Sequence, residues 1–275
     1  HGGRAAVTPA TLFMIGSISK SFTTLLMARL ADEGLLTWDT PVLDLDPGFT
    51  LGDAETTKKL LLRHTVCACA GLPRRDMEFL FEYEKATPES RLAEMAQMKP
   101  TTAFGEAFQY SNSMVAAGGY LAAHRLDPKR KLGPAYDHAM ATKVFTPLGM
   151  KSTLLDGKAA RRRDHAGGHA LGLDGGVARV PASAEGGLDA VRPAGGIWSN
   201  VRDMSRWLLT ELAGGKTPEG KVFVSEANLR ARYQPQATIS NVSSYGLGLV
   251  VGSASGLYSA GHDGGTSGYN ARAVV

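Results

Sequence analysis

The chain has 275 residues, of which 43% are hydrophobic and 33 are glycine, and its formal net charge is +4. This length and composition exclude a disordered or fibrous chain and indicate one large globular domain or two smaller ones. The surplus of basic residues is too small to indicate nucleic-acid binding, and the run Arg161-Arg162-Arg163 is typical of a solvated loop. In chain order, the first pattern is an apolar run from Leu12 to Ile15, followed by Gly16-Ser17-Ile18-Ser19-Lys20.

A helix is expected over residues 17–34, with Gly34 at its C-terminal end. Its apolar residues recur at helical spacing and predict a face that can be buried: Phe22, Leu25, Leu26, Met27 and Leu30. Ser17 and Lys20, three residues apart, lie on one face at its start. A serine becomes a nucleophile when a base takes its proton, and a lysine whose pKa is lowered by burial is such a base. The pair alone also fits a capping serine followed by a solvated lysine.

The middle of the chain predicts mainly helices. Lys58 to His64 is interpreted as a short buried helix that ends in a structural histidine, and Pro88 to Met98 as a second helix. Phe104 to Asn112 is a glycine-bearing segment that leads Tyr-Ser-Asn into a third helix. A phenol beside an ammonium is pushed toward phenolate, so Tyr110 could relay a proton between a serine and a leaving group. The alternative is a capping loop with a packed tyrosine.

The last third of the chain alternates between glycine-rich and apolar segments. Residues 154–190 have little periodicity and predict a long, mobile surface loop. A helix is expected after Asn200, and Tyr245 to Val251 is interpreted as a strand. Gly261 to Tyr269 is glycine-rich, as in a strand that lines a pocket, although a plain glycine-rich turn fits it too.

The two cysteines, Cys67 and Cys69, are one residue apart. They cannot join distant parts of the fold or form a zinc site by themselves, so we expect two small, buried or half-buried thiols. The apolar stretches are shorter than the roughly 18 residues that a membrane helix needs. Because the chain opens on His1-Gly2-Gly3-Arg4, we interpret its natural start as missing, and the cellular compartment stays open.

Three motifs occur in a fixed order: Ser17-x-x-Lys20 opening a helix, then Tyr110-Ser111-Asn112, then His262-x-Gly264. In this order they resemble the serine β-lactamase and penicillin-binding protein superfamily. The resemblance is greatest to its class C-like branch, which includes D-alanyl-D-alanine carboxypeptidases, D-aminopeptidases and family VIII esterases. Four flanking stretches are similar to segments of that branch: Phe13 to Phe22, Leu60 to Thr65, Pro147 to Met150 and Gly195 to Ser199.

The resemblance implies that Ser17 is the acyl-accepting nucleophile and Lys20 its base or base partner, and that Tyr110 moves the proton to and from the leaving group. It implies no cofactor. The chain also lacks the H-E-x-x-H zinc motif, the phosphate loop and a complete dinucleotide fingerprint, so we expect no metal either.

The resemblance also implies the binding residues. Asn112 would contact the substrate amide and Lys20, whereas His262 and Gly264 would line the site opposite the tyrosine. The backbone N–H groups of Ser17 and Gly265 would form the oxyanion hole. His262 stands where many relatives have the lysine of Lys-Thr-Gly, which helps to hold the carboxylate of a β-lactam, so we expect weak β-lactamase activity.

The implied fold is α/β (α+β): an antiparallel sheet flanked by helices plus a mainly helical subdomain, as in β-lactamases and transpeptidases. Residues 1–45 and 190–275 would form the α/β portion, and residues 46–189 the mainly helical portion, with the site between them. The family's sheet begins before the serine helix and continues after His-x-Gly, so we expect further strands beyond both ends of the sequence.

The predicted function is therefore a serine acyl hydrolase that forms an acyl-enzyme on Ser17 and cleaves an ester or amide. Its substrate would be a small molecule or peptide: a carboxylic ester, a β-lactam or a D-amino-acid peptide. The alternative is a catalytically silent scaffold or penicillin-binding module with the same fold. The sequence leaves the oligomeric state open.

Overall fold

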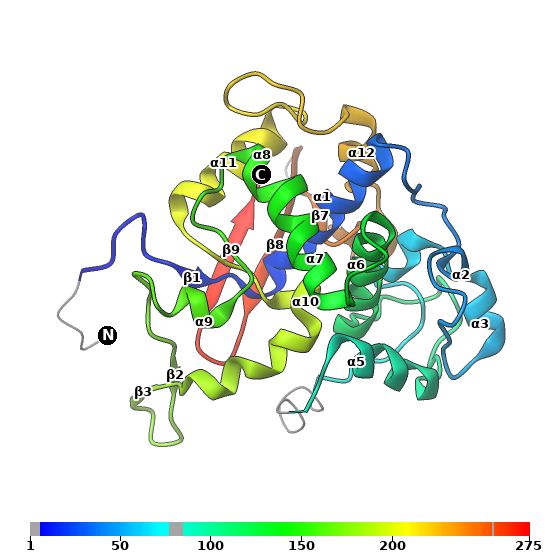
Figure 1. Cartoon of the computed structure of the whole chain (residues 1–275), viewed down its shortest axis with the longest axis horizontal. Coiled ribbons are helices and arrows are strands. Elements are labelled where there is room, and N and C mark those ends of the chain that lie inside the picture. The colour runs from blue at the N-terminus through cyan, green and yellow to red at the C-terminus, as the bar shows by residue number, and fades with distance from the viewer. Residues whose placement is uncertain (1–5, 77–84, 255) are drawn as a thin grey trace.

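A five-stranded antiparallel sheet, in the order β5-β6-β7-β8-β9, is formed by the C-terminal part of the chain (Figure 1). The structure is a computed structural model and describes residues 6–76, 85–254 and 256–275. The strands are β5 (Ala237–Ser240), β6 (Ser243–Tyr245), β7 (Val250–Ala254), β8 (Leu257–Gly265) and β9 (Asn270–Val274). β8 pairs with β7 up to Gly261 and with β9 from Gly261 onward. The part of β8 after Gly261 is not paired with β7, and this part contacts the serine motif.

Two short antiparallel ladders lie outside this sheet. β1 (Phe13–Met14) pairs with β4 (Trp198–Ser199), which brings the segment before Ser17 next to a segment from the last third of the chain. β2 (His169–Leu171) pairs with β3 (Val177–Arg179) in an exposed hairpin. The predicted combination of an antiparallel sheet with flanking helices is confirmed.

The helices fall mainly in the first 232 residues. The α-helices are α1 (Ser19–Asp32), α2 (Val42–Leu45), α3 (Ala54–Lys59), α5 (Pro88–Glu94), α6 (Asn112–Leu126), α7 (Leu132–Ala139), α8 (Thr146–Leu148), α9 (Gly157–Ala160), α10 (Arg192–Gly195), α11 (Val201–Leu212) and α12 (Glu226–Ala231). The 3₁₀ turns are η1 (Gly16–Ile18), η2 (Leu62–Thr65), η3 (Met95–Gln97) and η5 (Ala182–Val191), and η4 (Met140–Phe145) is a π-helix.

α1 runs through the middle of the molecule, between the sheet and helices α6 and α7 (Figure 1). The five apolar residues predicted to form its buried face are all buried. Ser21, Thr23 and Thr24 are buried as well, so α1 is enclosed on nearly all sides rather than amphipathic. Thr23 and Tyr136 share a hydrogen bond of 2.7 Å, and Ser21 donates to the Gly248 carbonyl at 3.1 Å. These polar contacts fix the helix that begins directly after Ser17.

Two sequence-based assignments are wrong in detail. Lys58 to His64 is not one helix, because α3 ends at Lys59 and the extended Leu60 and Leu61 precede η2. Tyr245 to Val251 is not one strand either: β6 ends at Tyr245, a turn closes with Gly246 N–H donating to the Leu249 carbonyl, and β7 begins at Val250.

Residues 154–190 contain more local structure than the predicted loop. They hold α9, the β2–β3 hairpin and most of η5, and Gly187 and Glu185 of η5 are buried. Short elements of three to ten residues give no clear periodicity, which is why the sequence did not reveal them. The division of the chain at residues 45 and 190 stays a prediction.

No helix in the part of the chain that the structure describes is both long and apolar enough to cross a membrane. The segment His1 to Arg4, interpreted above as a truncated start, lies outside the described residues.

Candidate active site

Ser17 lies in the turn η1, directly before α1, with its side chain partly exposed. Gly16 allows this turn, because its φ of +52° is one that residues with a side chain rarely adopt. A Cβ at Gly16 would also lie 2.8 Å from the backbone nitrogen of Gly265. The backbone before Ser17 is therefore in direct contact with the end of β8.

Lys20 is fully buried beneath Ser17. Its Nζ lies 2.9 Å from Ser17 Oγ and donates to the Ala194 carbonyl at 2.6 Å. Burial lowers the pKa of Lys20 well below its ordinary value, with Asp76 opposing this shift and Arg74 adding to it. A neutral amine keeps a lone pair, so Lys20 can accept the Ser17 proton.

Tyr110 approaches Ser17 from the opposite side. Its hydroxyl donates to Ser17 Oγ at 2.8 Å, and Lys20 Nζ lies 4.7 Å from the centre of its ring. The expectation that the ammonium pushes this phenol toward phenolate is wrong: burial raises the pKa of Tyr110 and outweighs the hydrogen bond that Tyr110 donates to Ser17 and the charge of Arg74. Tyr110 therefore remains a phenol that can donate a proton.

Gly264 packs the end of β8 against the serine turn. A Cβ at this position would lie 1.9 Å from the Ile15 carbonyl oxygen and 3.3 Å from the Ser17 nitrogen, so a larger residue would displace the backbone. The N–H groups of Ser17 and Gly265, named above for the oxyanion hole, thus belong to two backbone segments in contact.

His262 lies on β8 beside Tyr110, with 6.0 Å between the ring centres. Its Nδ1 donates to the Asp263 carbonyl at 2.5 Å, which leaves Nε2 to accept from the Tyr245 hydroxyl at 3.0 Å. Burial is the main cause that lowers the pKa of His262 to about 4. The imidazole is therefore neutral near pH 7.

Tyr245 is a site residue that the sequence analysis missed. It is fully buried, and its ring packs at 6.0 Å from Tyr110 and 5.5 Å from Phe108, measured between ring centres. It therefore supports both Tyr110 and His262 from behind. In the sequence it is one aromatic residue among apolar neighbours, which is also the pattern of an ordinary core residue.

Asn112 forms a hydrogen bond other than the one expected with Lys20. Its Nδ2 donates to Asp76 Oδ1 at 2.7 Å, and among the described residues no hydrogen bond joins it to Lys20. Asp76 also forms an ion pair with Arg74, whose guanidinium lies 5.3 Å from the centre of the Tyr110 ring. Arg74 and Asp76 lie in an irregular segment, so no spacing pattern could reveal them.

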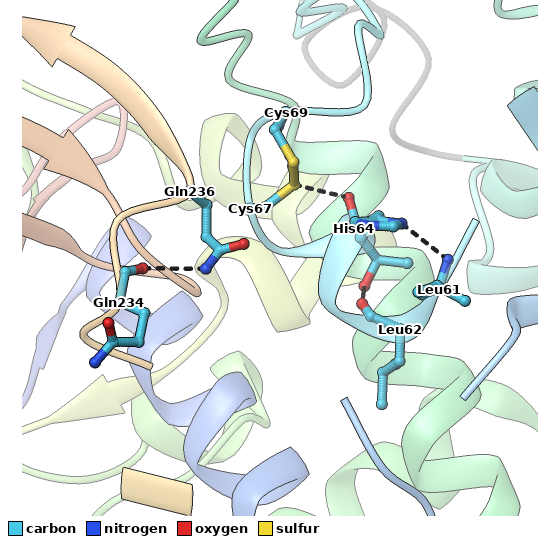
Figure 2. Close-up of a disulfide and its surroundings, with 8 residues drawn as sticks. Leu61, Leu62, His64, Cys67, Cys69, Gln234 and Gln236 are labelled. Atoms are coloured by element: carbon cyan, nitrogen blue, oxygen red, sulfur yellow. Dashed lines mark hydrogen bonds between the residues drawn. A yellow bond between two sulfur atoms is a disulfide. The ribbon is translucent and has the colours of Figure 1, made fainter. Parts of the chain in front are cut away.

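Cys67 and Cys69 form a disulfide (Figure 2), so the expectation of two thiols is wrong. Ala68 between them has a φ of +53°, and its carbonyl accepts a hydrogen bond from Gln109 N–H at 2.8 Å. The disulfide loop thus supports the residue directly before Tyr110. The spacing showed only that the two cysteines could not join distant parts of the fold. It did not show whether they would bond to each other.

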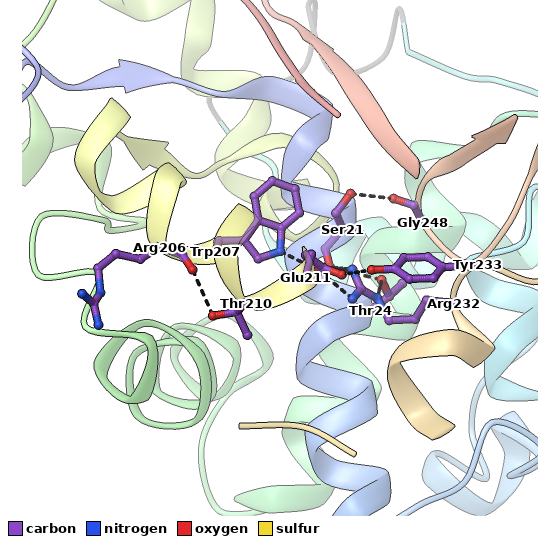
Figure 3. Close-up of polar contacts among 9 residues, drawn as sticks. All are labelled: Ser21, Thr24, Arg206, Trp207, Thr210, Glu211, Arg232, Tyr233 and Gly248. Atoms are coloured by element: carbon purple, nitrogen blue, oxygen red, sulfur yellow. Dashed lines mark hydrogen bonds and ion pairs between the residues drawn. The ribbon is translucent and has the colours of Figure 1, made fainter. Parts of the chain in front are cut away.

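A buried ion pair fixes the other side of α1 (Figure 3). Arg232 and Glu211 lie 2.7 Å apart with side chains 0% and 2% exposed. Arg232 also donates to the Thr24 hydroxyl at 3.1 Å and to the Ser21 carbonyl at 2.9 Å, and Glu211 accepts from Trp207 Nε1 at 2.7 Å. The helix that carries Lys20 is therefore joined to α11 and to the segment after α12.

No group of three or more histidine, cysteine, aspartate and glutamate side chains placed to hold a metal ion occurs within residues 6–76, 85–254 and 256–275. The polar groups that meet at Ser17 are an amine, a phenol and backbone N–H groups.

Comparison with known proteins places this chain in a family. A family model described as beta-lactamase matches residues 1–275. The chain belongs to the beta-lactamase family. A relative in this family, an unguisins hydrolase from Aspergillus campestris, is 27% identical over 96% of this chain and 50% of its own length. The chain spans about half the length of the first curated relatives that it matches.

Solved structures support the same fold. The octameric penicillin-binding protein homologue from Pyrococcus abyssi has a TM-score of 0.83 at 22% identity, over 99% of this chain and 60% of its own. A D-stereospecific amidohydrolase from Streptomyces has a TM-score of 0.74 at 22% identity, over 97% of this chain and 78% of its own. The beta-lactamase and penicillin-binding protein resemblance predicted from three short motifs is confirmed.

Proposed function

We propose that this beta-lactamase-family protein is a serine acyl hydrolase that works through an acyl-enzyme on Ser17. The observation that carries the proposal is the convergence of two groups on one oxygen: Lys20 Nζ at 2.9 Å and the Tyr110 hydroxyl at 2.8 Å from Ser17 Oγ. A neutral amine and a protonated phenol on one serine supply a base and an acid at the same point.

In the proposed acylation, the Ser17 hydroxyl proton moves to Lys20 Nζ while Ser17 Oγ bonds to the substrate carbonyl carbon. The carbonyl oxygen becomes an oxyanion that the N–H groups of Ser17 and Gly265 stabilise. As the carbon–heteroatom bond breaks, the leaving group takes a proton from the Tyr110 hydroxyl. The proton held by Lys20 then restores Tyr110, so the acyl-enzyme forms with every proton returned.

In the proposed deacylation, water attacks the ester carbonyl of the acyl-enzyme. One water proton passes through Tyr110 and Lys20 to Ser17 Oγ as the bond between Oγ and the acyl carbon breaks. The products are the free carboxylic acid and the original serine. The same two side chains thus act in both halves of the reaction, with their directions of proton transfer reversed.

We propose that the preferred substrate is a carboxylic ester or a D-amino-acid amide, and that a β-lactam is a poorer substrate. The neutral His262 offers no positive charge to a β-lactam carboxylate, since the pKa of His262 lies near 4. The name of one structural neighbour, a D-stereospecific amidohydrolase, is in line with an amide substrate.

Labelling with a fluorophosphonate and with a fluorescent penicillin, followed by intact-mass measurement, tests this proposal. We expect a single adduct on the wild type and none on Ser17→Ala. Ser19→Ala is the matched control, because Ser19 is buried next to the site and its hydroxyl accepts from Ile197 N–H, yet it is expected to keep the adduct. An adduct that survives Ser17→Ala would identify a different nucleophile.

The alternative, a scaffold or penicillin-binding module, gives a different result in the same experiment. A silent site would bind the penicillin reversibly, if at all, and would form no adduct with either reagent. A penicillin adduct that forms and persists for hours, together with no turnover of p-nitrophenyl esters, would support the penicillin-binding module.

A further inference from the structure

A cavity of about 390 Å³ lies beside the turn between β8 and β9, away from the residues that contact Ser17 Oγ. Its wall is formed by the segment after α9, the β2–β3 hairpin, η5, β4 and the residue before β9. Ser17, Lys20, Tyr110 and His262 do not line it. A volume of this size accommodates a small organic molecule.

Aromatic rings form one side of this cavity. Trp198, 1% exposed, and Tyr269, 8% exposed, pack edge to face with 5.4 Å between ring centres. The Tyr269 hydroxyl donates to the Ala166 carbonyl at 2.8 Å, which fixes the ring in place. The cavity therefore has a pre-formed apolar wall suited to a flat ring.

Two guanidinium groups, from Arg161 and Arg179, lie on the cavity wall. Neither forms an ion pair with a carboxylate among the described residues, although most other arginines with resolved contacts do so. One carboxylate, Glu185, lines the same cavity, so the lining carries one net positive charge with histidine neutral. A guanidinium that faces a concave apolar site is a suitable partner for a carboxylate ligand.

Glu185 is committed to the neighbouring turn rather than to the arginines. Its Oε1 accepts from the Thr266 hydroxyl at 2.9 Å and from Gly268 N–H at 2.8 Å, and the residue is 6% exposed. Burial raises the pKa of Glu185, whereas its hydrogen bonds to Thr266 and Gly268 and the charge of Arg161 act against this shift. The charge of Arg161 acts on Glu185 without forming an ion pair with it, and Arg179 has no carboxylate partner among the described residues, so both guanidinium groups can still pair with a ligand.

We propose that this cavity is a second binding site, for a small aromatic monocarboxylate, with the carboxylate held by Arg161 and Arg179 and the ring against Trp198 and Tyr269. The site does not depend on Ser17. Glu185 of the cavity wall accepts a hydrogen bond from Thr266, which directly follows Gly265 at the end of β8. The cavity therefore borders the proposed oxyanion hole, and a ligand in it would leave Ser17 accessible.

Isothermal titration with 2-naphthoate, and with its neutral analogue 2-naphthamide, tests the proposal on the whole chain. We expect saturable 1:1 binding of 2-naphthoate to the wild type and to Ser17→Ala, and at least tenfold weaker binding of 2-naphthamide. Arg179→Gln is expected to weaken 2-naphthoate binding at least tenfold, and its exposed position keeps the fold intact. Arg162→Gln, a neighbouring exposed arginine outside the cavity, is the matched control and is expected to bind normally.

Three results would overturn the proposal: no saturable binding of 2-naphthoate, equal binding of the neutral amide, or equal losses in Arg179→Gln and Arg162→Gln. Loss of binding after fluorophosphonate labelling of Ser17 would also overturn it, by placing the ligand in the active site. If no fluorophosphonate adduct forms but 2-naphthoate still binds, the proposed catalysis fails while the second site stands.

Discussion

Lys20, which belongs to α1, and Arg232, which packs against α1, are both fully buried basic side chains, but only one of them has a carboxylate partner. Arg232 has a carboxylate partner, Glu211, at 2.7 Å, together with the Thr24 hydroxyl and the Ser21 carbonyl (Figure 3). Lys20 has the hydroxyl of Ser17 and the carbonyl of Ala194, and among the described residues it forms no ion pair. One cation is neutralised by a partner, whereas the other is pushed to lose its proton.

The presence or absence of a carboxylate partner explains why Arg232 is structural and Lys20 is suited to act as a base. A buried charge without a partner is unfavourable, so the free energy is lowered when Lys20 releases its proton, and the pKa of Lys20 falls. An arginine cannot respond in this way because its pKa is too high, and it requires the carboxylate instead. Burial therefore produces a base at one end of α1 and a structural ion pair farther along it.

Replacing Lys20 is expected to have the largest effect on the chemistry. Lys20→Gln removes the base and should slow acylation of Ser17 by about 10³- to 10⁴-fold, at the upper end of the range for general-base catalysis. The melting temperature should not fall much, because a buried amine without a carboxylate partner stabilises the fold little. Adduct formation followed by mass against time, together with thermal unfolding, measures both. A loss of folding equal to the loss of acylation would show that Lys20 is structural.

The pH dependence of acylation follows from the same shift. With an ordinary pKa near 10.4, only about 0.1% of lysine side chains would be neutral at pH 7.5. Because burial lowers the pKa of Lys20, the acylation rate should rise with pH through that lowered pKa and reach a plateau well below pH 10. The raised pKa of Tyr110 keeps its proton available across this range. Lys20→Arg, which stays protonated, should show no plateau; a wild-type rate still rising at pH 10 would contradict the shift.

Replacing Arg232 should lower the stability of the fold more than the rate of acylation, the reverse of replacing Lys20. Arg232→Met leaves Glu211 buried without its cation and is expected to lower the free energy of unfolding by about 3–5 kcal/mol. The acylation rate per folded molecule should change only a few-fold. Arg230→Met is the matched control, because Arg230 is exposed and pairs with Glu226 at the surface, and it should leave stability nearly unchanged. Denaturant unfolding with active-site titration measures both quantities.

The sequence predicted the parts of this site that depend on local geometry. Ser17 and Lys20 are three residues apart at the start of one helix, so their proximity follows from helical spacing alone. Tyr110 comes from a loop 90 residues later, and only the order of three motifs associated it with them. Its hydrogen bond to Ser17 at 2.8 Å is a tertiary contact that no spacing encodes.

The parts that sequence could not predict depend on burial and on long-range packing. The direction of the Tyr110 pKa was wrong because a charged neighbour can be guessed from a motif, whereas the desolvation of the ring depends on the whole fold. Tyr245 and Asp76 were missed for the same reason: each acts on a residue that is distant in the sequence. The break between β6 and β7 depends on Gly248, whose φ is +72°.

Removing the Tyr110 hydroxyl should have an intermediate effect. Tyr110→Phe keeps the ring against Tyr245 and loses only the hydrogen bond to Ser17 Oγ, so acylation should fall by about 10²-fold. The loss should be larger for an alkyl ester than for a p-nitrophenyl ester, whose leaving group needs little protonation. Tyr258→Phe, at an exposed tyrosine, is the control. Equal losses for both esters would show that Tyr110 positions Ser17 without transferring a proton.

The smallest effect should come from Tyr245, which contacts the site only through other residues. Tyr245→Phe removes the hydrogen bond to His262 Nε2 and keeps the aromatic packing, so a change of about 1 kcal/mol, or roughly fivefold, is expected in kcat/KM. Because the pKa of His262 is near 4 through burial rather than through this bond, the pH profile above pH 6 should be unchanged. The His262→Gln variant should then be insensitive to Tyr245→Phe. If the effects of His262→Gln and Tyr245→Phe on kcat/KM are instead additive, Tyr245 acts through Tyr110. In that case, adding Tyr245→Phe to Tyr110→Phe should cause no further loss.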